Sequence, residues 1–219
     1  MVWSGMVMHK RKISFVFIVD VSGSMYGQKI ASVNACLREC MEEIRGFSDM
    51  GGYELKVSVM VFAEKMRLLY QDKDIMDIEV SDVVVEKGMD GFYPITSYSC
   101  LYSGLKQYFE KQAGRSYTGR TNEGDGSTYV VLMTDGKPTD PKQYEKERTQ
   151  ANNCMEFLKA VKYVAIADEQ TEKYNDATIS FVDFRAERIV RLSELPSEMR
   201  KLGMLAFADA EKQTVFGNF

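Results

Sequence analysis

The sequence predicts an α/β domain: a doubly wound, mostly parallel sheet of six strands with one antiparallel edge strand and helices on both faces. Short apolar runs of strand length alternate with longer segments whose apolar residues recur every three or four positions. Turn residues separate these segments, and most connections between strands are long enough to hold a crossover helix. Strands that alternate with crossover helices form an open parallel sheet covered on both sides.

The first part of the chain supplies three of the expected strands. An apolar strand is expected at 13–20, followed by a helix at 26–45 that Gly46 is placed to end. Residues 53–63 carry apolar side chains on both faces, so this strand is expected near the sheet centre. Residues 65–71 follow a turn too short for a crossover helix, which predicts the antiparallel edge strand.

The middle of the chain gives weaker patterns. Residues 74–85 fit either a short turn or a strand, and a loop marked by glycines and Pro94 precedes a helix expected at 99–111. Residues 115–127 are rich in Gly, Ser, Thr and charge, which predicts a flexible excursion.

The remaining elements complete the sheet and its cover. We expect a strand at 128–133, a helix at 140–159 and a strand at 163–167. A last strand or hairpin is expected at 178–184 or 188–192, and a closing helix at 193–208. We therefore divide the chain into an N-terminal extension at 1–11, one domain at 12–208 and a C-terminal tail at 209–219.

Composition narrows the class of partner. The chain of 219 residues is 45% hydrophobic and can bury the core of one fairly large domain. Its net charge of −4 and dispersed basic residues do not favour nucleic acid. No stretch approaches the roughly 20 apolar residues that span a bilayer, and the charge order at the N-terminus is the reverse of a secretory signal. The four cysteines form no CxxC pair, so we expect reduced thiols in a cytoplasmic protein.

The end of the first strand carries the most informative residues. Asp20, Ser22 and Ser24 follow five apolar residues at alternate positions, and Gly23 allows the backbone to turn among them. Carboxylate and hydroxyl oxygens are ligands that suit Mg²⁺ or Mn²⁺, whereas softer metals would call for Cys or His. The alternative is an ordinary turn that caps the following helix, because Ser and Asp favour such positions.

A second strand end repeats this chemistry. Asp135 follows the apolar run that ends at Thr134, much as Asp20 ends the first strand. In open α/β sheets ligands bind at the carboxyl ends of the strands, where the strand order reverses. We therefore expect Asp135 to face Asp20 across that point, although Asp135-Gly136 also fits a tight turn.

The run Asp20-Val-Ser22-Gly-Ser24, together with Thr134-Asp135-Gly136 after a later strand, resembles the von Willebrand factor A family and its metal-ion-dependent adhesion site. The resemblance covers roughly residues 12–208 and implies the Rossmann-like sheet of that family. Within the family, Ser24-Met-Tyr-Gly-Gln-Lys-Ile30 and Pro138-Thr139-Asp140 look closest to small bacterial cytoplasmic members associated with tellurite resistance.

The family implies one further ligand, a threonine hydroxyl from the loop that opens the middle helix. Ser99 lies at the expected spacing before Gly104-Leu105, and Thr96 has the expected residue type but lies three positions earlier. Ser99 is the residue that the spacing favours, and Thr96 is the alternative.

These residues lead to a function hypothesis. A Mg²⁺ ion, or Mn²⁺, would be held by a set of five side chains: Asp20, Ser22, Ser24, Ser99 and Asp135. The two carboxylates neutralise the ion, and a position stays open for an acidic residue of a protein partner. The module is then a binding domain with no catalytic role, no nucleic-acid partner and no membrane partner.

The competing hypothesis is a Mg²⁺-dependent phosphohydrolase with Asp20 as nucleophile. Ser22 stands where such enzymes need a second aspartate as general acid. The single histidine, His9, lies outside the expected domain, which excludes a Ser-His-Asp arrangement. No phosphate-binding glycine motif occurs.

Overall fold

The computed structural model describes residues 11–48, 53–117, 127–136, 144–167 and 184–204. It contains a six-stranded sheet in the order β3-β2-β1-β4-β5-β6. Neighbouring strands run parallel except β2 and β3, which pair antiparallel at one edge. The predicted fold class, a doubly wound mostly parallel sheet with one antiparallel edge strand, is confirmed.

The strands and helices alternate along the chain as expected. The strands are β1 (Arg11–Asp20), β2 (Tyr53–Phe62), β3 (Met66–Asp74), β4 (Thr128–Thr134), β5 (Val161–Ile166) and β6 (Arg188–Arg191). The helices are α1 (Gln28–Arg45), α2 (Tyr98–Tyr117), α3 (Glu145–Phe157) and a last one at 195–204. Short 3₁₀ turns at Gly23–Met25 and Leu192–Glu194 precede the first and last helices.

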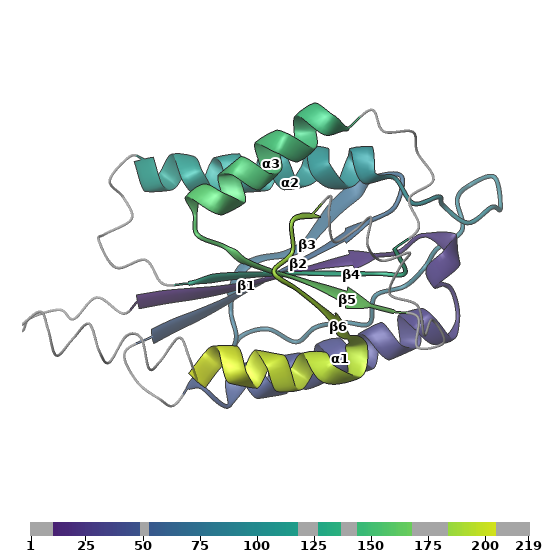
Figure 1. Cartoon of the computed structure of the whole chain (residues 1–219). Helices are drawn as coiled ribbons and strands as arrows, with labels where there is room; N and C mark the ends of the chain where they lie inside the picture. Colours follow the sequence, from purple (N-terminus) through teal and green to yellow (C-terminus); the bar gives the residue numbers. More distant parts are fainter. Residues whose placement is uncertain (1–10, 49–52, 118–126, 137–143, 168–183, 205–219) are drawn as a thin grey trace, which may run out of the picture.

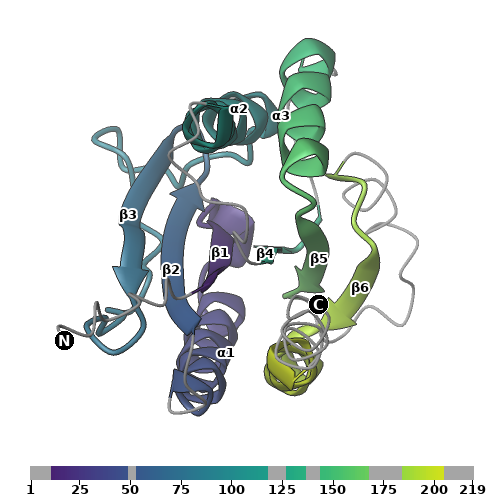
Figure 2. The same ribbon diagram turned by 90° about the vertical axis from the view of Figure 1, so that its left-hand side faces the viewer.

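Two helical layers enclose the sheet. Helix α1 and the helix at 195–204 lie on one face, and α2 and α3 lie on the other (Figures 1 and 2). The sheet divides the apolar core into two clusters: Phe17 and Val19 of β1 belong to one, and Val16 and Ile18 to the other. Because successive side chains of a strand point to opposite faces, a strand covered on both sides must be apolar throughout. Within the described helices, no segment is long and apolar enough to cross a membrane.

The segment after β3 is where the sequence patterns were weakest. Strand β3 continues to Asp74, and residues 78–88 form neither helix nor strand. This segment is held by the buried Asn34 of α1, whose amide donates to the Val83 carbonyl and accepts from the Val83 N–H, each at 2.9 Å. A side chain thus takes the place of a neighbouring strand as its hydrogen-bonding partner.

Several boundaries differ from the predicted ones. Helix α1 begins at Gln28 instead of residue 26 because Gly27 has a positive φ of 85°, which interrupts the helical turn before it. Helix α2 extends to Tyr117, six residues beyond the expected end. Residues 115–117, expected in the polar excursion at 115–127, instead continue α2, and Arg11, expected in the extension at 1–11, begins β1. The rest of the extension, positions 118–126 of the excursion, the helix start at 140–143, most of 178–184, the end of the closing helix at 205–208 and the tail at 209–219 are outside the described residues.

Candidate metal centre

The two predicted aspartates lie at the ends of neighbouring strands. Strands β1 and β4 are parallel partners, with Val19 opposite Met133, so both strands end at the same edge of the sheet (Figure 1). The chain leaves β1 for α1 on one face, whereas α2, on the other face, leads into β4. The strand order therefore reverses between β1 and β4, which is where ligands bind in sheets of this kind.

Asp20 is fully buried and held at both carboxylate oxygens. Its Oδ1 accepts a hydrogen bond of 2.9 Å from the Ser22 N–H, and its Oδ2 accepts one of 2.8 Å from the Thr134 hydroxyl. Burial raises the pKa of Asp20 from 3.8 to about 6, and the charge of Asp135 adds to the rise, whereas the bonds from Ser22 and Thr134 oppose it. Asp20 is thus an ionised carboxylate at neutral pH, withdrawn from water.

Three hydroxyl groups gather beside this carboxylate. The Ser22 Oγ lies 3.1 Å from the Ser24 Oγ, and the Thr96 hydroxyl donates to the Ser22 Oγ at 2.7 Å. Ser22 and Thr96 are buried, whereas Ser24 is exposed at the rim. The structure therefore brings together the three alternate residues after β1 and a threonine from the loop that precedes α2.

This loop is fastened to the Ser22 turn through its backbone. The Gly23 N–H donates to the Pro94 carbonyl at 2.8 Å. A Cβ atom at Gly23 would lie 2.6 Å from the Cβ of Tyr93, which is closer than carbon atoms pack. Gly23 is therefore needed for close approach of the two loops, and the positive φ expected of a turn glycine is found at Gly27 instead.

Asp135 approaches the same place from β4. Its side chain is 1% exposed and its Oδ2 accepts a hydrogen bond of 3.1 Å from the Lys29 ammonium. Its Oδ1 is buried and has no hydrogen-bond partner among the described residues. Gly136 then turns the chain with a φ of 83° and donates its N–H to the Thr134 hydroxyl. A buried carboxylate oxygen without a partner is unfavourable unless something absent from the protein chain binds it.

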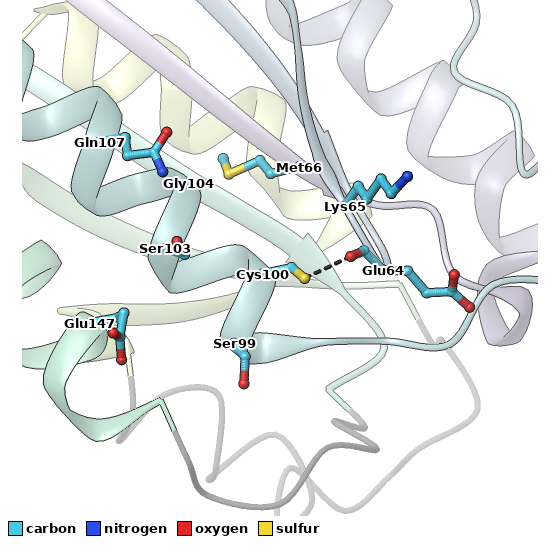
Figure 3. A pocket seen from close by; sticks show the side chains of 9 residues that line it. All are labelled: Glu64, Lys65, Met66, Ser99, Cys100, Ser103, Gly104, Gln107 and Glu147. Carbon is cyan, nitrogen blue, oxygen red and sulfur yellow. Dashed lines mark hydrogen bonds between the residues drawn. The ribbon is translucent and has the colours of Figure 1, made fainter.

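Ser99, the residue favoured by sequence spacing, faces different neighbours. It lies in the first turn of α2 and lines a pocket with Glu64 from the β2–β3 turn and Glu147 from α3 (Figure 3). Of the two alternatives in this loop, Thr96 is the one that the structure joins to Ser22.

Two further residues contact the candidate ligands and were missed by the sequence reasoning. Thr134 binds Asp20, and Lys29 binds Asp135. Both residues lie within the motifs that resemble the family, but the sequence predicted no contact of either with an aspartate. Thr134 directly follows Met133, which lies opposite Val19 in the β1–β4 register, and the predicted ends of the two strands could have suggested this closeness to Asp20. The contact of Lys29 with Asp135 joins residues 106 positions apart and carries no local signal.

The donor set fits a small hard cation. No three His, Cys, Asp or Glu side chains gather into a metal site within the described part of the chain. The available oxygens are instead two carboxylates and three hydroxyls, and one carboxylate oxygen, Oδ1 of Asp135, is buried without a partner among the described residues. Oxygen-only donors of this kind suit Mg²⁺ or Mn²⁺, which keep several waters of their own.

Aromatic side chains border the site on its outer side. The rings of Tyr26 and Tyr93 are in contact in a tilted arrangement, with centroids 4.7 Å apart and planes inclined by 38°, and Tyr26 remains 61% exposed. The Lys87 ammonium lies 5.0 Å from the centre of the Tyr93 ring. The rim thus combines exposed aromatic surface with a cation.

Comparison with known proteins agrees with this architecture. The von Willebrand factor type A domain model matches residues 15–178. A von Willebrand factor type A structure from Catenulispora acidiphila aligns with a TM-score of 0.54 at 14% identity, over 89% of this chain and 42% of that one. An aerotolerance-related membrane protein from Bacteroides fragilis aligns with a TM-score of 0.52 at 13% identity, over 91% of this chain and 99% of that one.

A third structure, proximal thread matrix protein 1 from the mussel byssus, aligns with a TM-score of 0.51 at 13% identity, over 90% of this chain and 46% of that one. At these identities the likeness is one of fold alone. The chain spans less than half the length of the Catenulispora and mussel chains. No protein with a curated function matches the sequence. The family model covers most of the 219 residues, and the chain therefore belongs to the von Willebrand factor type A domain family.

Proposed function

We propose that this domain holds Mg²⁺, or Mn²⁺, and through it binds an acidic residue of a protein partner. The side chains that would hold the ion are Asp20, Ser22, Ser24, Thr96 and Asp135. When bound, the cation supplies a hard electrophilic centre that a carboxylate from outside can approach. Domains of this family commonly mediate protein interactions, and this site gives that role a chemical basis.

The observation that carries the proposal is the buried Asp135 Oδ1, which has no partner among the described residues and belongs to a carboxylate close to that of the buried Asp20. Two buried carboxylates destabilise a fold unless positive charge compensates both, and the Lys29 ammonium compensates only one of them. The neighbouring hydroxyls of Ser22 and Thr96 add coordination without further negative charge. We therefore propose Thr96 as the loop ligand in place of Ser99.

The hydrolase alternative has less support. A nucleophilic carboxylate needs a free oxygen directed at the substrate. Both oxygens of Asp20 accept hydrogen bonds and its side chain is fully buried. Asp20 is better suited to orient and charge a cation site than to attack a phosphate ester.

A bacterial stress or tellurite-resistance complex in the cytoplasm is the setting that we propose for this interaction. It rests on the sequence resemblance described above. The free state of all four cysteines supports a reducing compartment.

Calorimetric titration with Mg²⁺ and Mn²⁺ tests the ion site directly. We expect one site in the wild type and none in Asp20→Asn, which keeps the shape of the side chain but not its charge. Asp82→Asn is the matched control, because Asp82 pairs with Arg38 on the exposed surface. Equal ion affinity in the wild type and Asp20→Asn would refute the assignment.

The acidic partner is tested with a glutamate-rich peptide. We expect the peptide to bind the wild type only when the ion is present, and not to bind Asp20→Asn. A control peptide in which Gln replaces each Glu should not bind. Turnover of a generic phosphate ester that requires both Mg²⁺ and Asp20 would instead establish the hydrolase.

A further inference from the structure

Lys29 occupies an unusual position for a cation. It lies in the first turn of α1, directly after Gln28, where the free N–H groups of the helix already create a positive potential. The first turn contains no acidic residue to compensate it. The Lys29 side chain instead reaches Asp135, and 29% of it remains exposed. A partner that offsets this unfavourable position is therefore a candidate ion ligand at the end of another strand.

This contact changes how Asp135 can act. Its Oδ2 accepts the hydrogen bond from the Lys29 ammonium, and Oδ1 is the oxygen that has no partner among the described residues. Asp135 is thereby oriented to offer one oxygen and not both.

The contact also changes the charge that the described residues bring to the site. Asp20, Asp135 and Lys29 together carry a formal charge of −1 where the two carboxylates alone would carry −2. A divalent cation then brings the site to +1, whereas two carboxylates alone would only neutralise it. A site with a residual positive charge binds an anion more strongly than a neutral site does, and binds the cation itself less strongly.

We propose that Lys29 is a specificity-determining residue of the ion site, one that trades affinity for the divalent cation against affinity for an incoming carboxylate. This inference rests on the proposed function and adds a prediction of its own: removal of the Lys29 charge shifts the two affinities in opposite directions. A residue that only stabilised the fold, or only positioned Asp135, would shift both in the same direction or neither.

Water-proton relaxation of Mn²⁺ measures both affinities with defined probes. Titration with Mn²⁺ alone gives the affinity for the cation, and subsequent titration with acetate follows the displacement of water from the bound ion. In Lys29→Gln we expect Mn²⁺ to bind roughly tenfold more tightly and acetate several-fold more weakly, as the loss of one screened charge implies. Lys29→Arg keeps the charge and should stay close to the wild type in both titrations.

The outcomes separate this inference from the function on which it rests. The proposed function fails if the wild type binds no Mn²⁺, or if Asp20→Asn binds Mn²⁺ as tightly as the wild type. The inference about Lys29 then fails with it. If the wild type binds Mn²⁺ but Lys29→Gln changes neither affinity, or changes both in the same direction, the inference alone is overturned. Should Lys29→Gln fold only with the ion, the acetate titration of the Mn²⁺-loaded variant decides: weaker acetate binding supports the proposal and unchanged binding refutes it.

Discussion

The Thr134 hydroxyl donates a 2.8 Å hydrogen bond to Oδ2 of Asp20 and so ties the end of β4 to the end of β1. The same hydroxyl oxygen accepts the Gly136 N–H at 3.0 Å. One buried side chain thus holds both Asp20 and the turn that follows Asp135. The two carboxylates owe their common position to this link as well as to the strand register.

Thr134→Val tests that link. Valine keeps the shape of the side chain but removes the hydroxyl, which leaves the Asp20 Oδ2 and the Gly136 N–H without this partner. Loss of a buried hydrogen bond to a charged group lowers the free energy of unfolding by about 2 to 3 kcal/mol. Urea denaturation in the presence of a chelator measures the change. Thr134→Ser retains the hydroxyl and should lose less than half as much; equal losses in the two variants would show that the methyl group, and not the hydrogen bond, is responsible.

The raised pKa of Asp20 predicts a pH dependence of the metal-free protein. The pKa is 3.8 in the unfolded chain and about 6 in the fold, so between these values the folded state retains a proton that the unfolded state has released. The free energy of unfolding therefore falls as the pH rises from about 4 to 6, by up to roughly 3 kcal/mol. Asp20→Asn lacks this titration, and the difference between wild type and variant, measured in chelator across that range, isolates it.

At neutral pH, Mg²⁺ should offset the loss of stability that the ionised Asp20 causes, because an ion that binds only the folded state stabilises it by mass action. The melting temperature of the wild type at pH 7.5 is expected to rise with Mg²⁺ concentration, and that of Asp20→Asn to stay constant. For the pH dependence, the difference in free energy of unfolding between the wild type and Asp20→Asn is the test. If this difference stays constant from pH 4 to 7 in chelator, it contradicts the raised pKa of Asp20.

The two loop hydroxyls offer a direct comparison. Thr96→Val removes the hydroxyl that contacts Ser22, and we expect Mg²⁺ affinity to fall at least tenfold, since loss of one oxygen ligand removes on the order of 1.4 kcal/mol or more of binding free energy. Ser99→Ala removes the hydroxyl that lines the neighbouring pocket and should leave the affinity within a factor of about two. Calorimetry on both variants decides between them, and the reverse result would restore Ser99 as the ligand.

The sheet was predictable because its signals are local. Each core strand is a short apolar run, and a strand buried on both faces, such as β1 with Phe17 and Ile18, cannot be polar on either side. The short turn between β2 and β3 excluded a crossover helix, so the antiparallel edge followed without knowledge of distant contacts. The segment after β3 resisted prediction because its order depends on Asn34, a residue on another element.

The residues of the candidate site also fall into those that local sequence predicts and those that depend on distant contacts. Asp20, Ser22 and Ser24 are close in sequence, and the strand ends predicted that Asp135 would approach them. Spacing favoured Ser99 as the ligand near the start of α2. The path of the loop before α2 depends on the hydrogen bond between Pro94 and Gly23 and on the packing of Tyr93 against Gly23. A count of residues along the chain contains no information about such a contact.

By itself, the sequence determined the α/β class, the order of strands and helices and the two acidic strand ends, because hydrophobic periodicity and chain connectivity act over a few residues. Only the tertiary structure decided that Thr96 contacts Ser22 and that Lys29 contacts Asp135. Those contacts depend on how loops and helix ends from different parts of the chain pack over one edge of the sheet, where hydrogen bonds and charges select partners regardless of their separation in sequence.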